Sequence, residues 1–104
     1  MSTPKSSQTL IANHVLVSGT VQGVNYRQSL AREANALNIK GWCRNLKDGR
    51  VEAFLQGNET SMQQLLAWME KGPSQAQVES VFCEPQAVLE PLLSQTIALF
   101  EIRQ

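Results

Sequence analysis

The sequence predicts one small α+β domain in which two helices cover one face of an antiparallel or mixed sheet. Three observations lead to this fold class: strand-like and helix-like segments alternate along the chain, an Asp-Gly pair separates two strand-like segments, and 42% of the 104 residues are hydrophobic, enough for one core. We expect residues 10–104 to form this single domain. Residues 1–9 are mostly polar and contain Pro4, so we expect them to be a disordered tail.

The first strand is predicted over residues 11–19, which are rich in β-branched side chains and end at a glycine. Val15 and Val17 share one face of this strand, and His14 and Leu16 share the other. A loop and a helix should follow.

Residues 20–25 show no periodicity and contain Gly23, which indicates a loop. Apolar residues then recur at helical spacing, namely Tyr26, Leu30, Ala34 and Leu37. We expect this helix to end at Asn38, because asparagine tolerates the left-handed conformation of a C-terminal cap.

Residues 39–46 and 50–56 flank Lys47-Asp48-Gly49, which predicts a β-hairpin. Alternation in the second of these strands places three side chains toward the core and three nearer solvent: Val51, Ala53 and Leu55, and Glu52, Phe54 and Gln56.

A second helix is predicted to begin at residues 60–63, Thr-Ser-Met-Gln, which have the form of a capping box. Its apolar stripe consists of Met62, Leu65, Leu66 and Met69. Gly72-Pro73 should stop it.

Residues 76–84 form the next predicted strand, and the shift of apolar phase between Val78 and Val81 indicates a bulge. Residues 86–95 have no clear period, whereas residues 96–102 alternate again, with Phe100 and Ile102 on one face. The order βαββαβ plus a short C-terminal strand is the ferredoxin-like split βαβ sandwich.

This topology brings two distant segments together. The first strand lies between the fourth and the third, and the third lies between the first and the second. The first and second strands are therefore parallel, about 10 Å apart, and end at the same edge of the sheet. We expect the loop at residues 20–27 and Asn45 to face a common pocket.

The loop that leads into the first helix could hold a phosphate, because free N–H groups and the helix dipole favour an anion there. Gly23 allows a tight curl, and the planar guanidinium of Arg27 matches two phosphate oxygens. Alone, such a turn is commonly only a connection, and Asn45 alone is typical of a turn.

Composition excludes several classes of function. Nine basic and nine acidic residues cancel, which argues against nonspecific binding of nucleic acid or anionic membrane. No apolar run reaches about 20 residues and no signal peptide is evident, so we expect a soluble, cytoplasmic protein. Cys43 and Cys83 lack metal or redox spacing, and we expect two reduced core residues about 14 Å apart that do not pair.

Two segments, GTVQGVNYR at residues 19–27 and GWCRNLKDGRVEAFLQG at residues 41–57, resemble both signature segments of the acylphosphatase family. The resemblance extends loosely over residues 11–102. It implies a cofactor-free, metal-free hydrolase that converts acyl phosphates to a carboxylate and inorganic phosphate. We expect a monomer, although no residue pattern indicates the oligomeric state.

The resemblance also implies site residues. Arg27 would bind the phosphoryl group and Asn45 would orient the attacking water. The loop residues whose amides would bind phosphate are Val21, Gln22, Gly23, Val24, Asn25, Tyr26 and Arg27. Thr20, Asn25 and Asn38 depart from the residues usual in the family, which bears on turnover and substrate preference.

Other functions on this fold remain as alternatives. A noncatalytic anion-binding regulatory domain would share the site without turnover. An RNA-recognition module needs exposed stacking aromatics, and the first and third strands offer only Phe54. A metal carrier would need a Cys-x-x-Cys pair in the first loop, which this sequence lacks.

Overall fold

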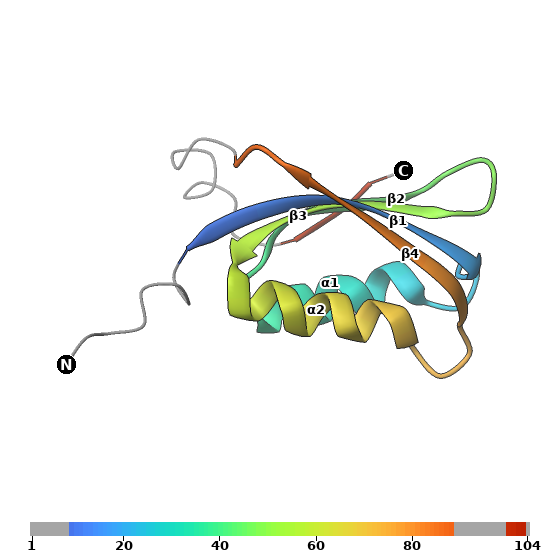
Figure 1. The fold of residues 1–104 in the computed structure, drawn as a ribbon. Coiled ribbons are helices and arrows are strands. Elements are labelled where there is room, and N and C mark those ends of the chain that lie inside the picture. The colour runs from blue at the N-terminus through green and yellow to red at the C-terminus, as the bar shows by residue number, and fades with distance from the viewer. Residues whose placement is uncertain (1–8, 89–99, 104) are drawn as a thin grey trace.

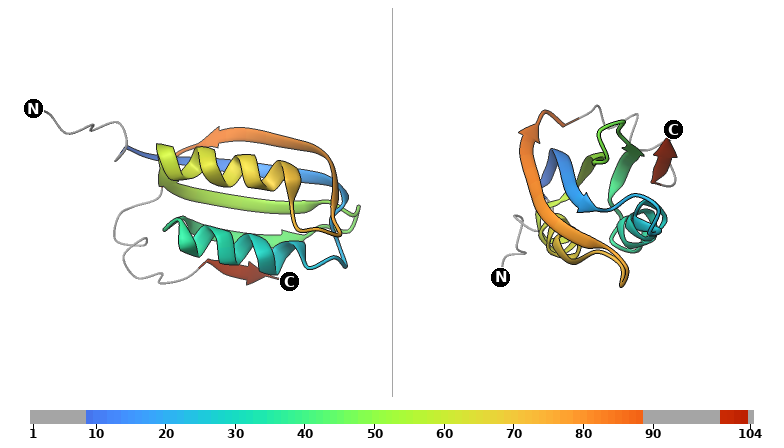
Figure 2. Two further views of the ribbon diagram at one scale, coloured as in Figure 1. Left: turned by 90° about the horizontal axis from the view of Figure 1, so that it is seen from below. Right: turned by 90° about the vertical axis from the view of Figure 1, so that its right-hand side faces the viewer.

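The computed structural model describes residues 9–88 and 100–103, and it confirms the predicted ferredoxin-like class. Five strands form one mixed sheet, and both helices lie against the same face of it (Figures 1 and 2). The elements are β1 (Leu10–Thr20), α1 (Tyr26–Ala36), β2 (Lys40–Asn45), β3 (Val51–Asn58), α2 (Glu59–Lys71), β4 (Gln77–Gln86) and β5 (Glu101–Arg103).

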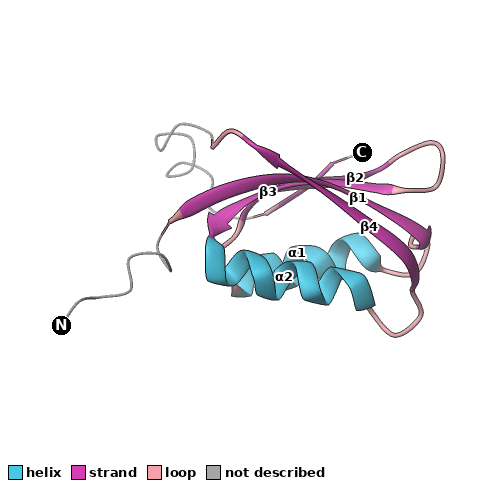
Figure 3. Ribbon diagram, in the orientation of Figure 1, coloured by secondary structure: helices cyan, strands magenta, loops and turns pink. Residues whose placement is uncertain are grey.

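The strand order is β4-β1-β3-β2-β5, as predicted for the first four strands. β3 pairs antiparallel with both β1 and β2, so β1 and β2 run parallel and end at the same edge of the sheet. The short β5 pairs parallel with β2. The two-layer arrangement leaves the other face of the sheet without helices (Figure 3).

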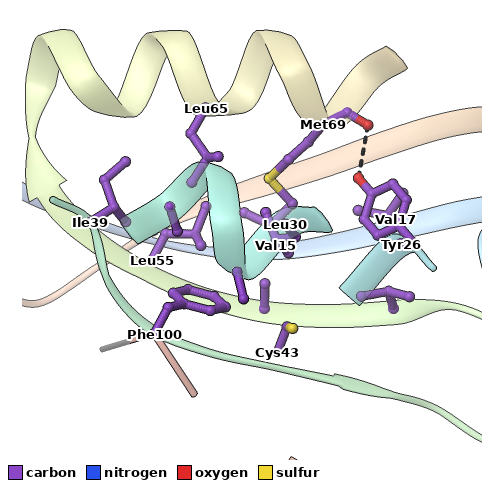
Figure 4. Close-up of a cluster of buried hydrophobic side chains, with 14 of the residues drawn as sticks. Val15, Val17, Tyr26, Leu30, Ile39, Cys43, Leu55, Leu65, Met69 and Phe100 are labelled. Carbon is purple, nitrogen blue, oxygen red and sulfur yellow. Dashed lines mark hydrogen bonds between the residues drawn. The ribbon is translucent and has the colours of Figure 1, made fainter. Parts of the chain in front are cut away.

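The core lies between the sheet and the helices (Figure 4). Val15 and Val17 of β1 are fully buried, as the alternation predicted. Burying one such side chain contributes roughly 2 kcal/mol. The Tyr26 hydroxyl donates a 2.8 Å hydrogen bond to the Met69 carbonyl, which joins the start of α1 to the end of α2.

The helix ends show why asparagine occurs at several junctions. Asn38 follows α1 with φ 60°, which confirms the predicted left-handed residue, and Asn25 precedes α1 with φ 67°. Asparagine is among the few residues other than glycine that adopt this conformation readily. Both departures from the usual family residues are therefore compatible with the local backbone.

The predicted capping box at residues 60–63 is wrong. Asn58, the extended last residue of β3, caps α2, because its Oδ1 accepts a 2.8 Å hydrogen bond from the Ser61 amide. The helix thus begins at Glu59 and continues to Lys71, where Gly72 with φ 72° ends it.

The predicted bulge in the fourth strand is confirmed. Ser18 pairs with Ser80 and Gly19 pairs with Val78, so Glu79 is the extra residue of β4.

The prediction that Cys83 is a core residue is wrong: Cys43 is buried, but Cys83 is exposed. β4 is an edge strand, and its residues from Phe82 onward are exposed.

Gln56 was expected nearer solvent, yet it is only 3% exposed. It lies on β3, which is flanked by β1 on one side and β2 on the other.

The predicted tail 1–9, except Thr9, and most of the irregular segment 86–95 lie outside the described residues. In the described part of the chain, no helix is both long enough and apolar enough to cross a membrane.

Candidate active site

The loop after β1 turns into α1 through two residues with positive φ, Gly23 at 77° and Asn25 at 67°. A Cβ at Gly23 would meet no atom within 4 Å. Glycine is therefore favoured there by the positive φ and not by a lack of room for a side chain. The Asn25 side chain makes no capping hydrogen bond, and the first turn of α1 has no acidic residue. The positive end of the helix dipole is therefore left for an external anion.

A pocket of about 220 Å³ lies between this loop and the end of β2. Its lining residues are Val21, Gln22, Gly23, Asn25, Tyr26, Arg27, Gln28 and Asn45. The structure thus brings Arg27 and Asn45 together, as the topology predicted. Val24, also predicted in the loop, packs its side chain against the core. Gln28 was not predicted; its place beside Arg27 in the first turn of α1 was the available indication.

Asn45 ends β2 and presents a buried polar atom that has no partner. Among the described residues, its Oδ1 is the buried side-chain atom without a hydrogen bond. Such atoms are rare in folded proteins because burying an unpaired acceptor costs about 1–3 kcal/mol. A water or ligand in the adjacent pocket would satisfy it.

Arg27 is held by the backbone of the last strand. Its Nη1 donates a 3.3 Å hydrogen bond to the Arg103 carbonyl of β5. No carboxylate in the ranges 9–88 and 100–103 forms an ion pair with Arg27. The positive charge at the pocket is therefore not neutralised within the described structure.

Two ionisable side chains near Arg27, those of Cys43 and Tyr26, remain protonated at neutral pH. Burial raises the pKa of the Cys43 thiol to about 12, although the Arg27 charge acts in the opposite direction. Its Sγ lies 4.0 Å from the Arg27 carbonyl oxygen. Burial also raises the pKa of Tyr26, with a further contribution from Cys43. Neither side chain supplies an anion that would repel a bound phosphate.

Gln22 reaches out of the loop toward the β2–β3 hairpin. Its Nε2 donates hydrogen bonds of 2.8 Å to the Leu46 carbonyl and 3.0 Å to the Arg50 carbonyl.

Within the described chain, no group of three or more His, Cys, Asp or Glu residues is placed to hold a metal ion.

Comparison with known proteins identifies the family. The acylphosphatase family model matches residues 13–95. A curated acylphosphatase from Chloroflexus aurantiacus is 50% identical over 72 residues, which cover 69% of this chain and 78% of the relative. One from Pseudomonas paraeruginosa is 44% identical over 94 residues, which cover 90% and 97%.

Solved structures agree with the sequence relatives. The structure of an acylphosphatase from Coxiella burnetii superimposes with a TM-score of 0.82 at 34% identity, and the match covers 97% of this chain and all of the other. The matched range includes the loop, Arg27 and Asn45. This chain belongs to the acylphosphatase family.

Proposed function

We propose that this protein hydrolyses the carboxyl–phosphate bond of acyl phosphates at the pocket between the β1–α1 loop and Asn45, giving a carboxylate and inorganic phosphate. The observation that carries the proposal is that one pocket is lined by two groups whose charge or lone pair is left for a ligand. Arg27 lacks a carboxylate partner within the described residues, and Asn45 Oδ1 lacks a hydrogen bond there. A phosphoryl group and a water molecule are the complementary ligands.

Phosphate binding is assigned to the loop and Arg27. The amides of residues 21–27 would donate to the phosphoryl oxygens, and the guanidinium would add a planar pair of donors. These donors neutralise charge on the oxygens that do not take part in bond breaking. Since the loop conformation is set by Gly23 and Asn25, the donors are already oriented before substrate arrives.

Asn45 is assigned to the attacking water. Its Oδ1 would accept a hydrogen from the water and hold the water oxygen in line with the bond to the leaving carboxylate. The water oxygen attacks phosphorus, and the bond to the acyl oxygen breaks. The electron pair leaves with the carboxylate, and the water proton passes to a phosphate oxygen.

The leaving group explains why no strong base is needed. A carboxylate is a stable anion, so positioning and charge balance suffice for phosphoryl transfer. Neither a guanidinium nor a carboxamide titrates near neutral pH.

The test is an assay of benzoyl phosphate hydrolysis in the presence of a metal chelator. We expect the unmodified protein to turn over. Arg27→Ala should lower kcat/KM by about 100- to 1000-fold, because one preorganised donor is lost. Arg32→Ala is the matched control, since Arg32 is exposed on the same helix, and it should retain full activity.

Two other results would redirect the interpretation. Inorganic phosphate should inhibit competitively, and a noncompetitive pattern would place the anion elsewhere. Binding of phosphate without any turnover would favour the alternative, a noncatalytic anion-binding regulatory domain. Near-normal activity of Arg27→Ala would contradict the assigned site.

We further propose that the protein acts as a cytoplasmic monomer that needs no cofactor and binds neither nucleic acid nor membrane. The balance of nine basic and nine acidic residues supports the lack of nonspecific polyanion binding. Light scattering at several protein concentrations tests the monomer, and titration with single-stranded RNA tests the absence of nucleic-acid binding.

A further inference from the structure

The Gln22 side chain joins two parts of the site that no strand pairing joins. Its amide nitrogen donates to both Leu46 O and Arg50 O, at 2.8 Å and 3.0 Å. These carbonyls lie at the base of the hairpin turn, where the Leu46 amide also donates to Arg50 O at 2.8 Å. Both N–H groups of the carboxamide are therefore used, one on each side of the turn.

The position of these bonds relates directly to Asn45. Leu46 follows Asn45 in the chain, and Gln22 belongs to the loop that lines the pocket. β1 and β2 are not neighbours, because β3 lies between them. The last β1–β3 pair is Val17 with Val51, so the sheet itself does not tie residues beyond Val17 to the hairpin turn.

We propose that Gln22 is a positioning residue that holds Asn45 at the correct distance from the phosphate-binding loop. The proposal rests on the function proposed above. The Gln22 side chain is not assigned a contact with the reacting atoms. It acts on Asn45 through its hydrogen bonds to the hairpin. A shift of about 1 Å in a positioned group can cost about 100-fold in rate, so loss of this tie should appear in the chemical step.

The kinetic test uses Gln22→Met, which keeps side-chain length and removes both donors. We expect kcat for benzoyl phosphate to fall by about 10-fold or more, while KM and the inhibition constant for phosphate change by less than about 3-fold. The reason is that Gly23 and Asn25, and not this bond, set the conformation of the phosphate-binding loop at residues 21–27. Gln63→Met, an exposed glutamine on α2, is the matched control and should not change kcat.

A double-mutant cycle separates positioning from a general structural effect. In an Asn45→Ala background, Gln22→Met should lower kcat by no more than about 2-fold, because the group that Gln22 positions is gone. A merely structural role predicts the same loss in both backgrounds. Equal losses, or a kcat of Gln22→Met within about 2-fold of the unmodified protein, would overturn the proposal.

A second readout does not depend on turnover. The side-chain amide resonances of Asn45 in a nitrogen-15 NMR spectrum should shift on addition of inorganic phosphate, and this response should be lost in Gln22→Met. The Arg27 Nε resonance should still respond. If the protein showed no turnover but the Asn45 resonances still responded to phosphate in a way that depended on Gln22, the proposed function would be refuted and the positioning role of Gln22 would remain. If Gln22→Met left the Asn45 response unchanged, the positioning role of Gln22 would be refuted. Urea midpoints of all variants verify folding.

Discussion

Arg44 and Asn45 are neighbours on β2, yet their side chains meet opposite conditions on the two faces of the sheet. On the face without helices, Arg44 Nε donates a 2.6 Å hydrogen bond to Glu52 Oε1, and His14 Nε2 lies 2.7 Å from Glu52 Oε2. Both carboxylate oxygens thus have a partner. On the helix face, Asn45 Oδ1 is buried and has no partner within the described structure.

The difference distinguishes a structural polar cluster from a binding site. Folded proteins pair nearly all buried polar groups, so a group left unpaired beside a pocket marks a place reserved for a ligand. The Arg44, Glu52 and His14 cluster contains more ionisable groups than the pocket does. Its members satisfy one another, however, and we expect it to affect stability and not catalysis.

The sharpest test of this contrast exchanges each of the two neighbours for alanine. Asn45→Ala should lower kcat by about 100-fold or more, because it removes the group that orients water. Its free energy of unfolding should stay the same or rise, since an unpaired buried acceptor is removed. The measurements are benzoyl phosphate kinetics and urea unfolding.

Arg44→Ala should behave in the opposite way. Activity should change by less than about 2-fold, and the free energy of unfolding should fall by no more than about 1 kcal/mol, as is usual for a partly exposed ion pair. If Arg44→Ala lost activity and Asn45→Ala did not, the two faces would have been assigned the wrong way round.

Glu52 sharpens the comparison through the pH dependence of stability. Burial raises the pKa of its carboxyl, but the hydrogen bonds from His14 and Arg44 outweigh burial and lower it overall. A lowered pKa in the folded state stabilises the protein above the ordinary carboxyl pKa of about 4.3, and this stabilisation is lost as pH falls below that value. Glu52→Gln should therefore cost about 1 kcal/mol at pH 7 and progressively less as pH falls below about 4.3, by urea unfolding.

The pocket, by contrast, should show almost no pH dependence. Guanidinium and carboxamide groups do not titrate near neutral pH, and burial raises the pKa of Cys43 to about 12. Apart from ionisation of the substrate, kcat should vary by less than about 2-fold between about pH 5.5 and 7.5. A steep step in that range would implicate another side chain, with His14 as the first to examine.

The smallest expected effect concerns the two thiols. Cys43 is buried on β2 and Cys83 is exposed on the edge strand β4. Ellman's reagent should label Cys83 quickly in the native protein and Cys43 only after unfolding. Cys83→Ser should abolish the fast phase while changing stability by no more than about 0.5 kcal/mol. Fast labelling of Cys43 would show that the core around β2 opens in the native protein.

Much of the fold follows from local pattern, because period and capping chemistry depend on neighbours in the chain. The left-handed Asn38 and a bulge between Val78 and Val81 were predictable in this way, whereas the order of the first four strands followed from the topology of the fold class. The cap of α2 was misassigned because two possible capping residues lie close together, Asn58 and Thr60. Asn58 is the actual cap, because it ends β3 in an extended conformation directly before the helix. Cys83 was misassigned because an apolar pattern does not reveal that a strand lies at the edge.

The sequence by itself determined the fold class, the two signature segments and the meeting of Arg27 with Asn45 at one edge of the sheet. Only the tertiary structure decided that Asn45 Oδ1 is unpaired among the described residues, that Gln22 reaches the hairpin, and that the Arg103 carbonyl contacts Arg27. The physical reason is that periodicity reports which face a side chain occupies. Its hydrogen-bond partners come from residues distant in sequence, and their distances are set by register and packing.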